Sequence, residues 1–245
     1  MSTKTTNLLL VVLLVASASL VGGCEEAAPT RPAPTIISGE APALPTAAVP
    51  TAVSIAVGDP AEHIAKGRRL LDAGNPDEAV LQFQAALQGD SESVEARFQL
   101  GNAFANLNRL AEAEREFRRV IELEPSNSDA LSNLGVVYYR QMNLDAAIDV
   151  FEKALAIAPD DAAVHYNLGS AYLQQNKPDE ARREFEQALS LDPELPETYY
   201  GLGSMYALQE EKAKAIEAFD KFLELSTDPE WRAHAEQQLK ELGAD

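Results

Sequence analysis

Glycine recurs at a fixed interval of 34 residues along most of this 245-residue chain, at Gly67, Gly101, Gly135, Gly169 and Gly203. An alanine follows each glycine by twelve residues, and a phenylalanine follows each alanine by four, at Phe83, Phe117, Phe151, Phe185 and Phe219. A period of this length indicates a row of similar supersecondary units, because one unit cannot bury its apolar face alone and must stack on the next. The sequence therefore predicts a repeat array rather than one globular core.

Residues 129–160 illustrate what one unit folds into. Apolar side chains recur there at helical spacing in two stretches separated by a short polar turn, which predicts two antiparallel helices. Gly135 and Ala147 are small enough for the two backbones to approach closely, and Phe151 fills the space beyond them. Pro159 is expected to end the second helix, because proline lacks an N–H and clashes with the preceding turn.

The spacing and residue types of these columns resemble the tetratricopeptide repeat. The resemblance implies an all-α fold, a right-handed superhelical solenoid of about five helix pairs within residues 59–229. Residues 230–245 are amphipathic and are predicted to form a C-terminal capping helix, which covers the open end of the last repeat. The five copies are placed at residues 60–93, 94–127, 128–161, 162–195 and 196–229.

The N-terminus carries an apolar run that is shorter than the roughly 20 residues of a membrane-spanning helix and is typical of a signal peptide. It ends in "LVGGC", where Cys24 is the only cysteine of the chain. This stretch resembles a bacterial lipobox, whose cysteine is linked to diacylglycerol, cleaved and N-acylated, for example with palmitate. Residues 1–23 are therefore predicted to be a lipoprotein signal peptide; an uncleaved N-terminal anchor is the alternative. Either way the folded part is expected outside the cytoplasm, anchored at the cell membrane or outer membrane.

Residues 24–58 are predicted to be a disordered linker behind the lipidated cysteine. From residue 25 onward this stretch has six prolines, nine alanines and no hydrophobic periodicity. Such a segment buries too little apolar surface to offset the entropy of ordering it. The linker would hold the repeats away from the membrane.

The charge and the motif content exclude several function classes. Lys and Arg total 20 against 39 Asp and Glu, a net charge of −19, and such an acidic surface repels nucleic acid. The sequence shows no phosphate-binding loop, nucleophile elbow or metal-ligand spacing, and its three histidines do not form a motif. We therefore expect a protein that is not an enzyme and that binds no cofactor, metal or nucleic acid.

The first helix of each pair is expected to line the concave side of the solenoid and to bind a protein or peptide partner. Carboxamides there can donate to and accept from one peptide unit, and aromatic rings add contact area at low entropic cost. Because Glu95, Asp129 and Glu197 lie at the edge of this groove, a neutral or basic segment should be favoured. The side chains of Asn102, Asn133, Arg140, Tyr166 and Asn167 are expected to point away from the helix-packing columns, so that replacing them leaves folding intact. The predicted groove residues are Phe98, Asn102, Asn133, Arg140, Tyr166, Asn167 and Tyr200.

Two functions follow from these expectations. The first is a membrane-tethered scaffold for protein–protein interaction, in the assembly of a cell-envelope machine. The second is an accessory subunit of an envelope enzyme such as a peptidoglycan hydrolase or synthase.

Overall fold

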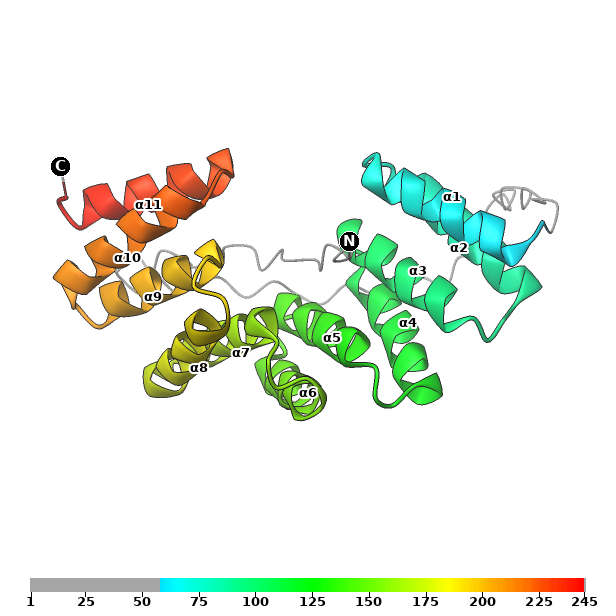
Figure 1. Cartoon of the computed structure of the whole chain (residues 1–245), viewed down its shortest axis with the longest axis horizontal. Coiled ribbons are helices and arrows are strands. Elements are labelled where there is room, and N and C mark those ends of the chain that lie inside the picture. Colours follow the sequence, from blue (N-terminus) through cyan, green and yellow to red (C-terminus); the bar gives the residue numbers. More distant parts are fainter. Residues whose placement is uncertain (1–57, 245) are drawn as a thin grey trace, which may run out of the picture. The chain divides into compact units, whose positions relative to one another are not determined.

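Residues 58–244 are described by a computed structural model (Figure 1). The predicted signal peptide, Cys24 and the linker up to residue 57 lie outside this range. Eleven helices and no strand are found in the described residues, which confirms an all-α solenoid of five helix pairs with a capping helix. The helices are α1 (Pro60–Asp72), α2 (Pro76–Gly89), α3 (Val94–Asn106), α4 (Leu110–Leu123), α5 (Ser128–Arg140), α6 (Leu144–Ile157), α7 (Ala162–Gln174), α8 (Pro178–Leu191), α9 (Pro196–Leu208), α10 (Lys212–Leu225) and α11 (Pro229–Glu241).

Side-chain caps start most of the first helices. Asp59, Ser93, Asn127 and Asp161 each accept a hydrogen bond from a backbone N–H in the first turn that follows. Such a cap contributes about 1 kcal/mol, because those N–H groups have no partner inside the helix. In α9 the capping position is held by Leu195, which supplies no side-chain bond.

A single residue in the left-handed backbone conformation turns the chain between the two helices of every pair. Glycine or asparagine holds this place in three repeats, as the conformation favours. Met142 and Glu210 hold it in the third and fifth repeats, with φ of 61° and 60°. The turn geometry is therefore kept even where the residue type does not favour it.

The repeated glycine and phenylalanine meet inside each pair. All five phenylalanines of the column are fully buried. At Gly135 an added Cβ would lie 2.6 Å from Phe151 Cδ1, which is too close for any side chain. The two columns therefore set how closely the helices of a pair approach.

The first helices lie on the inner side of the array. Each pair packs on the next in chain order, and α1, α3, α5, α7 and α9 also contact one another across neighbouring repeats (Figure 1). Within the described residues the second helices make no comparable contacts with each other. Because the first helices are the closer set, the array curves toward them, and they form its concave face.

The C-terminal helix α11 covers the end of the fifth repeat. Trp231 packs edge-on against Tyr200, with ring centroids 5.0 Å apart, and Ala235 and Leu239 are buried below it. The last apolar face is thereby removed from water.

Candidate peptide-binding groove

The predicted groove residues divide into two groups by exposure. Phe98, Asn102 and Arg140 are half-buried on the first helices. The other four are nearly inaccessible: Asn133 (6 % exposed), Asn167 (4 %), Tyr166 (4 %) and Tyr200 (8 %). Sequence spacing placed all seven on the first helices of their repeats, but it did not distinguish exposed side chains from buried ones.

Two asparagines from successive repeats form an amide pair on the concave side. Asn133 Nδ2 on α5 donates to Asn102 Oδ1 on α3 over 2.8 Å. A carboxamide has both donor and acceptor groups, so each side chain keeps a further polar atom for another partner. The pair therefore offers one donor and one acceptor, fixed relative to each other by the stacking of two repeats.

Arg140 is held by the neighbouring repeat. Its Nη1 donates to the carbonyl oxygen of Ala105 (2.9 Å) and its Nη2 to Oδ1 of Asn108 (3.1 Å). Burial lowers the pKa of the guanidinium. Arg140 thus ties α5 to the C-terminal end of α3, in addition to any contact with a ligand.

The two tyrosines belong to the core, so the expectation that replacing Tyr166 leaves folding intact is wrong. Tyr166 packs on Phe185 with ring centroids 6.0 Å apart, and burial raises its pKa. Tyr200 packs edge-on against Phe219 (5.5 Å) and Phe222 (5.4 Å). Their rings are long enough to reach the seam between the helices, whereas the third repeat has the short Ser132 at the same position.

Sequence reasoning placed Glu197 at the edge of the groove but left out Tyr139 of the central repeat. Tyr139 on α5 is half-buried, and burial raises the pKa of its hydroxyl. Glu197, in the first turn of α9, has a covered Oε2 that accepts no hydrogen bond from the described residues. Burial raises the pKa of this carboxyl as well. The available signal was the repeat register, which aligns Glu197 with Glu95.

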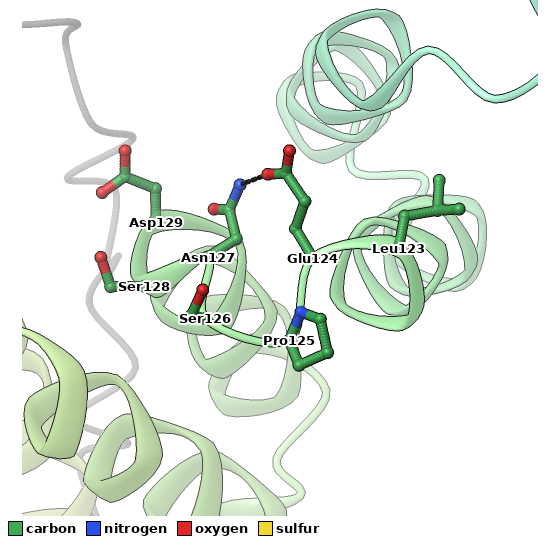
Figure 2. Close-up of a pocket in the computed structure, with 7 residues that line it drawn as sticks. All are labelled: Leu123, Glu124, Pro125, Ser126, Asn127, Ser128 and Asp129. Carbon is green, nitrogen blue, oxygen red and sulfur yellow. Dashed lines mark hydrogen bonds between the residues drawn. The ribbon is translucent and has the colours of Figure 1, made fainter.

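A shallow polar hollow lies at the connection between α4 and α5, lined by residues 123–129 (Figure 2). Both polar atoms of the Asn127 side chain are already used there. Its Nδ2 donates to Glu124 Oε2 (2.9 Å), and its Oδ1 accepts from the Ala130 N–H (2.9 Å). The hollow is thus part of a helix cap, and we assign no ligand to it.

Two further classes of site were sought in residues 58–244. No three His, Cys, Asp or Glu side chains in this range are grouped as metal ligands would be. None of the helices there has the length and apolar character needed to cross a bilayer.

Comparison with known families identifies the repeats. Models of the tetratricopeptide repeat match residues 64–122, 127–194 and 166–229. Members of this family generally serve as non-catalytic scaffolds that bind proteins or peptides, and no enzyme family is indicated. Among curated proteins, none matches the chain.

Solved structures agree with this assignment. A MamA structure from Desulfovibrio magneticus RS-1 is 30% identical, with 69% of this chain and 97% of that chain covered and a TM-score of 0.62. PilW, a type IV pilus biogenesis factor, is 18% identical, with 76% and 86% covered and a TM-score of 0.68. YrrB, described as having an unusual peptide-binding site, is 23% identical, with 73% and 92% covered and a TM-score of 0.56. From the repeat columns, the packing of the pairs and these matches, the chain belongs to the tetratricopeptide repeat family.

Proposed function

We propose that this protein is a membrane-tethered, non-catalytic scaffold that binds an extended segment of a partner protein on its concave face. The amide pair of Asn102 and Asn133 carries the proposal. It leaves a carboxamide donor on Asn102 and a carboxamide acceptor on Asn133, and one peptide unit can use a donor and an acceptor together.

The charge of the chain favours a neutral or basic segment. The net charge is −19, and Arg68 on this face is already paired with Glu95. Arg140 is bonded to two neutral acceptors, so its charge offsets only a small part of the repulsion that an acidic segment would meet. Of the similar solved structures, YrrB has an unusual peptide-binding site and PilW is a type IV pilus biogenesis factor. We place the present protein in a similar role at the cell envelope.

Replacing both members of the amide pair should abolish most binding. In Asn102→Ala with Asn133→Ala, both partners of the hydrogen bond are removed at once, so neither is left without the other. We expect the circular dichroism and the melting temperature to stay close to those of the native chain. Recovery of the partner from detergent-solubilised membranes should fall tenfold or more, since about 1.4 kcal/mol of binding energy already gives that factor.

The matched control lies on the second helices. Arg118 and Arg183 are exposed there, so Arg118→Ala with Arg183→Ala should leave recovery intact. Arg182 is unsuitable as a control, because its Nη2 donates to Gln209 Oε1 (2.8 Å) in the next repeat. Loss of binding in the control pair alone would show that the partner docks on the convex face instead.

The tether has a test of its own. We expect the mature chain to begin at Cys24, to carry acyl groups and to partition with membranes. Cys24→Ser should leave an unprocessed precursor, because the thioether cannot form. The intact mass of the native protein measures this, and a mature chain without acyl mass would refute the lipid anchor.

A further inference from the structure

The residue four places before the repeat glycine contacts the connection from the preceding repeat. In residues 58–244 this occurs at three of the four junctions, where its side chain meets the main-chain oxygen ten residues before the glycine. The fourth junction has Leu131 there, which has no polar side-chain atom. We call the three contacts latches, because each ties a first helix to the repeat before it. They are Arg97 Nη2 to Ser91 O (2.6 Å), His165 Nε2 to Pro159 O (3.1 Å) and Tyr199 Oη to Pro193 O (3.1 Å).

The latch of Arg97 shows how one side chain can hold several elements. Arg97 Nη1 also donates to Glu116 Oε2 on α4, over 3.1 Å. A guanidinium has five donors, so it serves a carboxylate and a main-chain oxygen together. A cation between these two acceptors therefore joins α3, α4 and the connection that precedes them.

The latch of His165 has the same two kinds of acceptor. Its Nδ1 lies 2.7 Å from Glu184 Oε2 on α8, and its Nε2 lies 3.1 Å from the Pro159 oxygen. A neutral imidazole has one N–H, so both contacts are hydrogen bonds only when the ring carries two protons. Because glutamic acid is a stronger acid than imidazolium, the second proton belongs on the ring. The His165 side chain is only 12% exposed, so water cannot easily replace either partner.

The charged groups around this latch are mostly acidic. Burial is the largest cause that raises the pKa of Tyr172 to about 12, and the charges of three glutamates add to it. Glu184, Glu180 and Glu152 therefore lie around one ring, and Lys177 Nζ is 5.8 Å from its centroid. This balance favours a cation between Glu184 and Pro159. The other charged groups of these elements are paired, used in a cap or exposed: Lys153 with Asp149, Arg182 with Glu211, Asp161 as the cap of α7, and Asp160 and Arg183 in water.

We propose that His165 is a pH-sensitive latch between the third and fourth repeats, held as an imidazolium between Glu184 and the Pro159 carbonyl. Loss of one proton leaves a single N–H, which the carboxylate retains because the charge-assisted hydrogen bond is the stronger one. The Pro159 carbonyl is then released, and the connection between α6 and α7 loosens.

The three latches differ in their response to pH. Histidine changes its charge between pH 5 and 8, whereas arginine and tyrosine keep their protons throughout this range. The stabilisation by His165 is therefore present at the acidic end of the range and is lost as the pH rises and the second proton leaves. The latches of Arg97 and Tyr199 stay closed. This inference is independent of the proposed function.

Replacing His165 by arginine tests the latch in the full-length protein in detergent. His165→Arg reproduces the arrangement of Arg97 with a charge that does not titrate in this range. Between pH 5.5 and 8, the melting temperature of the native protein should fall by about 2–4 °C more than that of His165→Arg. This is the shift expected from the loss of one hydrogen bond in a chain of this length. Equal pH dependence in the two proteins would overturn the proposal.

A second variant keeps the histidine and changes its partner. In Glu184→Gln the amide can donate to Nδ1, so the ring needs only the proton on Nε2, and the extra fall in melting temperature should disappear. The contact of His63 Nδ1 with Gln82 Oε1 (3.0 Å) shows that a histidine and a glutamine fit at these positions. His63→Gln is the matched control and should keep the pH dependence of the native protein. Retention of the fall in Glu184→Gln, or its loss in His63→Gln, would refute the assignment to His165.

Hydrogen exchange locates the change along the chain. After correction for the intrinsic effect of pH, the backbone amides of residues 158–164 should exchange about threefold faster or more at pH 8 than at pH 5.5. The connections at residues 90–96 and 192–198, which carry the other two latches, should show no such change. A similar increase in all three connections, or none in residues 158–164, would reject His165 as the latch.

Discussion

Replacing Phe151 by alanine is expected to lower the free energy of unfolding by about 3–5 kcal/mol. Phe151 is fully buried and fills the space against Gly135 in the central repeat. Removing its ring leaves a cavity that the surrounding helices cannot close completely, because Gly135 and Ala147 are too small to fill it. Thermal and urea unfolding followed by circular dichroism measure the loss.

The effect should also change the shape of the transition. Stability in a repeat array is close to a sum over units and their neighbour interfaces, so damage at the centre uncouples the two ends and broadens the melt. Leu81→Ala is the matched control, since Leu81 is 50% exposed on α2, and it should change stability by no more than about 0.5 kcal/mol. A sharp, unshifted transition in Phe151→Ala would show that the central repeat does not couple the array.

Gly135→Leu is expected to destabilise the same repeat by overpacking, by about 1–3 kcal/mol. The new Cβ would lie 2.6 Å from Phe151 Cδ1, and the ring has no open side to move into, because it is fully buried. The two helices of the pair must therefore separate. A lowered urea midpoint measures the cost.

Ala111→Leu provides the control for this substitution. Ala111 is an exposed position of α4, so the same increase in side-chain size meets water rather than a ring. We expect its midpoint to stay near that of the native chain. Equal losses at Gly135 and Ala111 would contradict the close approach of α5 and α6.

The core was predictable from sequence, whereas the groove was predictable only in part. The phenylalanine that recurs in each repeat, such as Phe117 or Phe185, has the same packing environment five times. The period alone therefore identifies this position as part of the core. A concave position has no such constraint, because its environment depends on side-chain length and on the neighbouring repeat. Ser132 and Tyr166 share one place in the register, yet only the tyrosine reaches a phenylalanine ring.

Side-chain contacts between repeats could not be predicted from the sequence for a related reason. Arg140 was expected to line the groove, and it instead donates to the preceding repeat, just as Arg182 donates to the following one. Their partners lie 35 and 27 residues away, and nothing in the helical period of a single segment shows that pairing. The lipid anchor and linker stay predictions, since they lie outside the described residues.

The close packing of α9 against the Phe185 ring restricts how this array could change its length in evolution. Gly201 lies so close to that ring that an added Cβ would be 2.8 Å from Phe185 Cζ, and Met205 fills the interior nearby. Repeats two to four carry Gln99, Asn133 and Asn167 in the place of Gly201, and smaller residues in the place of Met205. Duplication or exchange of units among those three would keep a longer side chain in the place of Gly201 and a smaller one in the place of Met205. The fifth repeat, with Gly201 and Met205, is suited to the end of the array. New copies of a repeat would therefore have to be inserted before it.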